Sequence, residues 1–364
     1  MMLPSTGARS TLALATTAGI VLIFMFGVLA WRSPPRLSFP SHADLAAIPK
    51  PNSSPIAIQD IIRSLFEPLK IPVNQPDFVD EDGIKFSLPE KIRFNKGLGN
   101  KVLILDLDTR PLKSTDDYNR GEFDWRKINH VSGGVFNHYT YSLIHGYDYK
   151  FIQASNFKDR HPTWIKPSAL ANHIKNYDFI IFLDADATFR FMHLPIEWML
   201  NYWNIEKKHS ITMSLDPWDP KEPGYNSDRF NRTYTNTGFM AVQNNDEIMP
   251  ILKAWHECPD DTRYANCSEW KMPKFHEQSA FGEYIRYDYE DNIKELPCAE
   301  ANGFPGVVVS NCVGKFIRHY WFDKSAVKQD FRDNVMQAIS LPIQGLFADP
   351  SHGVVTMQKE NVIS

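Results

Sequence analysis

The sequence predicts an α/β domain whose first half is Rossmann-like, behind an N-terminal membrane anchor and a stem. Three short apolar runs between residues 101 and 186 are typical of strands that are covered on both faces. Segments with a helical distribution of apolar residues separate these runs, and this alternation is typical of a layered α/β sheet. In such sheets ligands bind beyond the carboxyl ends of the strands.

An uncharged and mostly apolar segment occupies residues 10–31. Its length is about the ~20 residues that a helix needs to cross a bilayer. Arg9 and Arg32 flank it almost evenly, so these charges orient the helix poorly. We predict a transmembrane signal anchor over 10–31 and a cytosolic tail over 1–9. A cleaved signal peptide is the alternative, because small residues precede Trp31 as a cleavage site would.

A proline-rich stem is predicted for residues 32–97, where ten prolines and many polar residues disfavour long elements. Within it, residues 57–69 are compatible with one short helix. The alternating pattern that follows predicts a lumenal catalytic domain over 98–347, which is long enough to bury a core. Residues 348–364 remain as a C-terminal tail.

Four cysteines in two close pairs and three N-x-S/T sequons indicate an oxidising, glycosylating lumen. Four cysteines allow three pairings, and we favour Cys258–Cys267 with Cys298–Cys312. Free buried thiols are the alternative, whereas the absence of a C-x-x-C motif argues against a zinc site. The sequons begin at Asn52, Asn231 and Asn266.

The secondary structure of the domain can be predicted in chain order from these patterns. Pro167 is compatible with a helix only in its first turn, which favours a helix start near Trp164. The predicted order is a strand over 101–108, a helix over 129–147, a strand over 149–155, a helix over 164–176 and a strand over 178–186.

The third apolar run ends in Asp184 and Asp186, which are spaced i, i+2. In an extended chain two such residues point to the same face, so both carboxylates can converge on one cation. Carboxylate oxygens suit Mg²⁺ and Mn²⁺. A cation there would bridge to a diphosphate and neutralise charge as that group departs.

A second chemistry fits the same residues. Asp184, Asp186 and Thr188 match the D-x-D-x-T of haloacid-dehalogenase-type phosphatases, in which the first Asp is the nucleophile. The stretch 105–110 matches only in part, since Arg110 replaces the expected Thr or Val. That fold also needs a late acidic motif, and no Gly-Asp dipeptide occurs in this sequence. The phosphatase is therefore the weaker interpretation.

From about Lys101 to Lys324 the domain resembles glycosyltransferase family 34, which implies a GT-A fold with a mixed central sheet. The family transfers galactose, mannose or xylose from a nucleotide diphosphate sugar, with retention of configuration and with Mn²⁺. No single motif is specific for this family, but the order and spacing of the motifs together are specific for it. The stretches that carry the resemblance are "HGYDYKF" (145–151), "WIKPSAL" (164–170), "FLDADATF" (182–189), "NTGFMAVQN" (236–244) and "HEQSAF" (276–281).

The resemblance implies a donor site. Asp184 and Asp186 would be the D-x-D motif of the family, and Lys166 matches a lysine that contacts the diphosphate. Asn236 would bond a sugar hydroxyl, and Gly238 would permit close approach of the backbone. The nucleotide base would lie near the end of the first strand, for which we name Asp106 and Asp108.

The resemblance also implies a catalytic segment and a third metal ligand. Glu277 and Gln278 would lie nearest the anomeric carbon, whereas His276 replaces an acid of the family pattern. His319 would be the third metal ligand, assigned by its role because Ser310-Asn311-Cys312 replaces the usual residues before Cys. An imidazole ligand favours Mn²⁺ over Mg²⁺.

Two mechanisms are compatible with retention. Glu277 can act as a nucleophile in a double displacement. Alternatively, Gln278 supports the oxocarbenium-like cation while the acceptor attacks from the side of the leaving group, which is the course that the family implies. We assign acceptor recognition to the loop 216–234, where Trp218 and Tyr225 offer aromatic faces to a sugar.

We therefore predict a retaining, metal-dependent hexosyltransferase that moves galactose or mannose, in preference to xylose, from a UDP- or GDP-sugar to a glycan acceptor. A catalytically inactive protein that binds a nucleotide sugar or a glycan is the alternative. The expected location is the Golgi membrane, in type II orientation, with a transferase complex or a homo-oligomer left open. A net charge of −4 without a basic run gives no support to nucleic acid binding.

Overall fold

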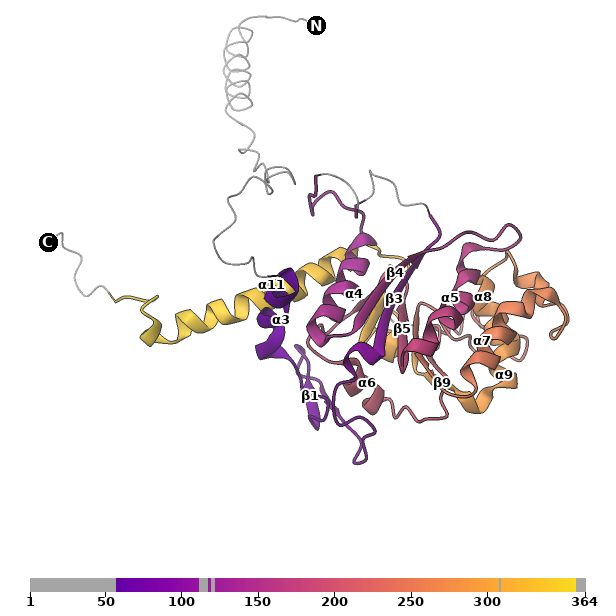
Figure 1. The fold of residues 1–364 in the computed structure, drawn as a ribbon, viewed down its shortest axis with the longest axis horizontal. Helices are drawn as coiled ribbons and strands as arrows, with labels where there is room; N and C mark the ends of the chain where they lie inside the picture. Colours follow the sequence, from indigo (N-terminus) through magenta and orange to yellow (C-terminus); the bar gives the residue numbers. More distant parts are fainter. Residues whose placement is uncertain (1–56, 111–116, 119–121, 308, 358–364) are drawn as a thin grey trace, which may run out of the picture. The chain divides into compact units, whose positions relative to one another are not determined.

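The computed structural model describes residues 57–110, 117–118, 122–307 and 309–357. The predicted anchor at 10–31 and the first half of the stem lie outside these residues. Within the described part of the chain, no helix is long and apolar enough to cross a membrane. Figure 1 shows a central sheet with helices on both of its faces.

Six strands form one mixed sheet in the order β4-β3-β5-β8-β7-β9. β3 is parallel to both of its neighbours, β8 is antiparallel to both of its neighbours, and β7 is parallel to β9. The α/β class and the mixed sheet that the sequence predicted are thus confirmed. The strands are β3 (Val102–Asp108), β4 (Asp148–Gln153), β5 (Phe179–Leu183), β7 (Ile211–Ser214), β8 (Phe239–Gln243) and β9 (Ile293–Leu296).

The central strands are buried on both faces because their apolar residues alternate between two hydrophobic cores. In β5, Phe179 and Ile181 join one core, while Ile180 and Phe182 join the other. This alternation is the structural reason for the continuous apolar runs in the sequence. The strand ends at Leu183, so the predicted extension to Asp186 is wrong: Ala187 N–H donates to the Asp184 carbonyl and closes a turn there.

Helices cover both faces of the sheet (Figure 1). The predicted helices over 129–147 and 164–176 are confirmed as α4 and α5, with Pro167 in the first turn of α5. The helices are α3 (Ile58–Phe66), α4 (Ser132–His145), α5 (Ile165–His173), α6 (Ile196–Tyr202), α7 (Ile248–Glu257), α8 (His276–Ala280), α9 (Arg286–Asp288), α10 (Cys298–Ala301) and α11 (Ser325–Ala348).

The second half of the predicted stem packs against the domain instead of standing apart from it. Phe66 on α3 is buried, as are Phe78 on β1 (Asp77–Val79), Phe86 on β2 (Lys85–Ser87) and Phe94. All four phenylalanines belong to one hydrophobic core of the domain. The proline content shortened these elements, but burial of the aromatic side chains still holds residues 57–97 in place.

A separate two-stranded sheet lies beyond the end of β5, next to Asp184 and Asp186. β6 (Ala187–Phe189) pairs with β10 (Ile317–His319), and the register sets His319 opposite Ala187. This pairing joins segments far apart in the chain. Two disulfides, Cys258–Cys267 and Cys298–Cys312, confirm the predicted pairing.

Candidate metal centre

Two carboxylates and one imidazole converge beyond the end of β5. Asp184, Asp186 and His319 each offer a ligand atom, and these atoms lie within 4.8 Å of one another. His319 Nε2 is 3.2 Å from an oxygen of Asp186. The turn after β5 brings the two carboxylates together, and the β6–β10 register adds the histidine. Two hard oxygen donors with one imidazole suit a divalent cation such as Mn²⁺.

Gly238 makes room for the histidine. A Cβ atom built at this position would lie 2.1 Å from His319 Cε1, so no other residue fits without moving the ring. The Gly238 carbonyl also accepts from Asp184 N–H at 2.8 Å. Gly238, which the sequence analysis assigned to the donor cleft, therefore lies directly before β8 and contacts His319 of the candidate metal centre.

Asn302 orients the imidazole of His319. Its Oδ1 lies 3.2 Å from His319 Nδ1 and accepts from Trp321 Nε1–H at 3.1 Å. Trp321 Nε1–H also lies 3.1 Å from His319 Nδ1, so Asn302 and Trp321 together hold the ring. When Nδ1–H donates to Asn302, the lone pair of Nε2 is directed toward the carboxylates, as metal binding requires. Asn302 was missed in the sequence, because it has no motif of its own.

Lys166 lies buried behind the carboxylates. Its Nζ is 3.0 Å from Asp184 and 3.3 Å from Glu277, and it also donates to both oxygens of Thr237. Burial works to lower the pKa of Lys166, but Asp184 and Glu277 outweigh this and raise it. The side chain therefore carries a positive charge at the position from which the sequence predicted contact with a diphosphate.

Glu277 and Gln278 are both buried at the start of α8. Gln278 is fully engaged, since Nε2 donates to Asp216 at 2.7 Å and Oε1 accepts from Thr237 N–H at 3.1 Å. Glu277 Oε1 accepts from the Thr237 hydroxyl at 3.0 Å, whereas Oε2 has no hydrogen-bond partner among the residues that the structure describes. A buried acceptor without a partner is uncommon and is found at functional sites.

Asp216 is a site residue that the sequence analysis placed only within a loop. It is buried, and besides Gln278 it accepts from Asn236 at 2.8 Å and from Asn302 at 3.3 Å. Burial raises its pKa. Asn236 was expected to bond a sugar, but Nδ2 bonds Asp216 and Oδ1 accepts from Gly238 N–H. Asp216 thus connects three residues in one polar network: Gln278 on α8, Asn236 before β8, and Asn302, which contacts His319.

Lys324 is a second cation that the sequence analysis missed. Its Nζ is 2.9 Å from Asp186, while the side chain is 53% exposed. Burial works to raise the pKa of Asp186, but His319 and Lys324 together hold it well below its usual range. Lys324 could have been found from the sequence, because it lies only five residues after His319, at the C-terminal end of the stretch that resembles family 34.

A cavity of about 140 Å³ opens beside the metal centre. Lys166, Asp184, Asp106 and Asp108 line it, together with the aromatic ring of Tyr118. The oxygens of Asp106 are already engaged, because Tyr149 O–H donates at 2.6 Å and His138 Nδ1 lies at 2.8 Å. Asp106 therefore lines the cavity while it ties α4 and β4 to the end of β3.

The predicted acceptor loop 216–234 exposes aromatic rings. Trp218 is 41% exposed and Tyr225 is 52% exposed. The Tyr225 ring stands under the ammonium of Lys274 at 3.4 Å and edge-on to Phe275, the residue before α8. The loop therefore begins at Asp216, which belongs to the polar network, and its Tyr225 packs against Lys274 and Phe275, just before Glu277.

No family model matches the sequence, and no curated protein matches it either. Among solved structures, a glycosyltransferase involved in glycosylation of the major capsid of PBCV-1 matches with a TM-score of 0.45 and 12% identity, over 64% of this chain and 98% of that chain. The galactosyltransferase LgtC, in complex with donor and acceptor sugar analogs, matches with a TM-score of 0.37 and 10% identity, over 64% and 95%. At these values we base no assignment on the likeness.

Proposed function

We propose that this chain is a retaining, metal-dependent hexosyltransferase of the glycosyltransferase 34 type. It would move galactose or mannose from a UDP- or GDP-sugar to a glycan acceptor. The observation that carries the proposal is the convergence of Asp184, Asp186 and His319, with buried Lys166 behind them and a cavity beside them. A buried cation that lines the cavity, with candidate metal ligands beside it, suits a diphosphate group.

The donor atoms fit a divalent cation. Asp184 and Asp186 contribute carboxylate oxygens, and His319 contributes Nε2 with Asn302 behind its other nitrogen. The contacts of His319 and Lys324 with Asp186 show that this carboxylate attracts positive charge. When bound, a cation such as Mn²⁺ would neutralise charge on the diphosphate as the sugar leaves.

The chain's own residues would handle the diphosphate from two sides. Lys166 lines the cavity and is held in place by Asp184, Glu277 and Thr237, so its charge is preorganised. Lys324 is exposed and free to turn toward an incoming diphosphate. Charges that are positioned before the reaction stabilise the developing negative charge without a cost of reorganisation.

The reacting carbon would lie near Glu277 and Gln278. We favour attack of the acceptor from the side of the leaving group, with the acceptor proton passing to the departing phosphate oxygen. Asp216 and Thr237 hold Gln278 in one orientation, which suits a supporting role. The alternative is a double displacement at Glu277 Oε2, which has no partner in the described part of the chain. A glycosyl adduct on Glu277, detected by intact-protein mass spectrometry, would establish the alternative instead.

The compartment is part of the proposal. Two disulfides agree with an oxidising lumen. The apolar segment 10–31 would anchor the domain to the Golgi membrane in type II orientation. The exposed rings of Trp218 and Tyr225 would receive the glycan acceptor.

The test is nucleoside diphosphate release by the purified full-length chain, with a panel of UDP- and GDP-sugars, simple glycosides as acceptors, and Mn²⁺. We expect release with one donor, and its loss with EDTA and with Asp186→Asn. Asp291→Asn, at an exposed acid away from the site, serves as the matched control and should keep full activity. NMR of the product would show retained configuration.

Two results would contradict the proposal. Release of inorganic phosphate instead of a nucleoside diphosphate would indicate a phosphatase. Binding of a nucleotide sugar without turnover, in the presence of all acceptors tested, would indicate a binding protein.

A further inference from the structure

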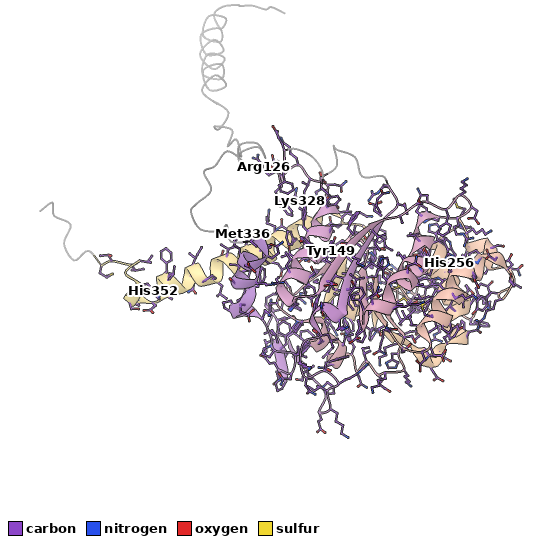
Figure 2. All side chains as sticks on the ribbon, viewed as in Figure 1. Arg126, Tyr149, His256, Lys328, Met336 and His352 are labelled. Atoms are coloured by element: carbon purple, nitrogen blue, oxygen red, sulfur yellow. A yellow bond between two sulfur atoms is a disulfide. The ribbon has the colours of Figure 1, made fainter. Side chains whose placement is uncertain are left out.

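The second half of α11 exposes large apolar side chains to solvent. Figure 1 shows this helix running out beyond the rest of the domain, and Figure 2 labels Met336 on it. Ala338 is the last buried residue of the chain as described, and every residue from Ile339 to Met357 is exposed. The exposed fractions of Met336, Ile339, Ile343, Leu346 and Phe347 range from 37% to 58%.

The two halves of α11 differ in what they contact. In the first half, Val327 is buried, and Asp330 bonds Thr188 and pairs with Arg318. From Asn334 to Ala348 there is no charged residue. The first half thus belongs to the domain, whereas the second half has an uncharged surface that the domain does not cover.

Five of the six large apolar residues that are exposed between Met336 and Phe347 lie along one side of the helix, whereas Leu341, which is 43% exposed, lies on another side. Met336, Ile339, Ile343 and Leu346 follow one another at intervals of three and four residues, and Phe347 lies beside them; we call these five residues the apolar stripe. Gln337, Ser340 and Gln344 are spaced in the same way along another side. Large apolar side chains exposed on an uncharged helix surface can insert into the interface of a membrane, where burial of apolar area contributes to binding.

The position of the stripe in the chain points to the same partner. α11 contacts α3, the first described helix, on which Ile58 is 60% exposed and Ile61 is 48% exposed. Twenty-six residues, 32–57, connect α3 to the apolar segment 10–31. Fully extended they would reach at most ~90 Å. The connecting chain therefore sets an upper limit to the distance between α3 and a bilayer that holds 10–31.

We propose that the apolar stripe of α11 inserts into the interface of the bilayer to which residues 10–31 anchor the chain. The stripe would be a second attachment that limits the rotation of the domain above the membrane. Because the anchor keeps α11 at a high effective concentration near the bilayer, a stripe that binds only weakly on its own would stay inserted. This inference depends on the anchor and not on the proposed transferase activity.

The test uses the full-length chain reconstituted in phosphatidylcholine vesicles. All four cysteines of the sequence form disulfides, so one introduced cysteine is the sole free thiol. We would attach an environment-sensitive fluorophore to Ile343→Cys, on the apolar stripe, or to Gln344→Cys, its neighbour on the polar side. A nitroxide on the upper part of the lipid acyl chain then reports contact with the bilayer.

We expect at least about twofold stronger nitroxide quenching at position 343 than at position 344, together with a blue shift only at 343. Equal quenching at both positions would overturn the proposal, and so would failure of the chain to associate with vesicles. Disulfide cross-linking between two Ile343→Cys chains, without lipid quenching, would show that a second copy covers the stripe instead. Melting temperatures matched to the parent chain confirm that both labelled variants are folded.

Discussion

The imidazole of His319 lies directly against Gly238, at a separation that leaves no space for a single methyl group. A Cβ at 238 would come within 2.1 Å of Cε1 and 2.6 Å of Nδ1. The two residues are far apart in the sequence, and their contact determines where the imidazole of the candidate metal centre lies. The geometry of the candidate metal centre therefore depends on the absence of a side chain.

Gly238→Ala should weaken metal binding without removing any ligand. The added methyl group would displace the ring of His319, so we expect apparent Mn²⁺ affinity to fall about 10- to 100-fold. The measurement is the Mn²⁺ dependence of nucleoside diphosphate release. Gly345→Ala, on α11 and outside the proposed donor and acceptor sites, is the control, because a Cβ there meets nothing within 4 Å. An unchanged Mn²⁺ dependence in Gly238→Ala would contradict the assignment of His319 as a ligand.

Lys166→Met should destabilise the protein as well as inactivate it. Glu277 is buried, and loss of Lys166 would leave its charge uncompensated, at a cost of about 3–5 kcal/mol in the free energy of unfolding. The double variant Lys166→Met/Glu277→Gln removes both charges, so most of the stability should return. Urea unfolding measures both effects.

Activity separates the two roles of Lys166. Compared with Glu277→Gln alone, we expect nucleoside diphosphate release in the double variant to be reduced roughly 100-fold or more, since only the double variant lacks the positive charge beside the cavity. Recovery of activity along with stability would show that Lys166 only balances buried carboxylates.

Lys324→Gln should affect the reaction but not the fold. Its side chain is 53% exposed, so the contact with Asp186 adds little to stability, and we expect the free energy of unfolding to change by less than about 0.5 kcal/mol. Loss of a charge-assisted bond to the diphosphate should lower kcat/KM by about 10- to 100-fold. Lys253→Gln, at a 72% exposed lysine on α7, is the matched control. Equal kinetics in both variants would remove Lys324 from the site.

His145 should make the stability of the domain depend on pH. Burial lowers the pKa of this histidine from 6.5 to about 3, while its Nε2 lies 2.9 Å from the Met192 carbonyl. Between these pH values the unfolded chain binds a proton that the folded chain does not. The contribution of neutral His145 to stability is therefore lost progressively as the pH falls below 6.5.

His145→Gln removes this titration and keeps a hydrogen-bond donor. Its free energy of unfolding should fall less steeply than that of the parent between pH 6 and pH 4, by up to ~1.4 kcal/mol per pH unit. Denaturant unfolding at several pH values measures the slopes. His130→Gln, at an exposed histidine, should keep the parent slope. Parallel slopes in all three proteins would show that His145 is not the group responsible.

The local pattern of the sequence determined the α/β class, the core strands and part of the site. The apolar runs predicted β3 and β5, because a strand covered on both faces needs apolar residues at nearly every position. β4 was also predicted, although it is the edge strand and is only partly buried. The spacing of the cysteines indicated the disulfides. The acids at the end of the third run indicated the cation site, although Asp184 and Asp186 meet through a turn and not through the pleat of a strand.

Only the tertiary structure decided how distant segments complete the site. The pairing of β6 with β10 brings His319 to Asp186, and packing brings Asp216 to Gln278. Burial of phenylalanines likewise joins residues 57–97 to the domain. These contacts depend on which surfaces meet in three dimensions, and a periodicity within one segment carries no information about its partner. The sequence therefore determined which chemical groups are available, and the fold determined which of them act together.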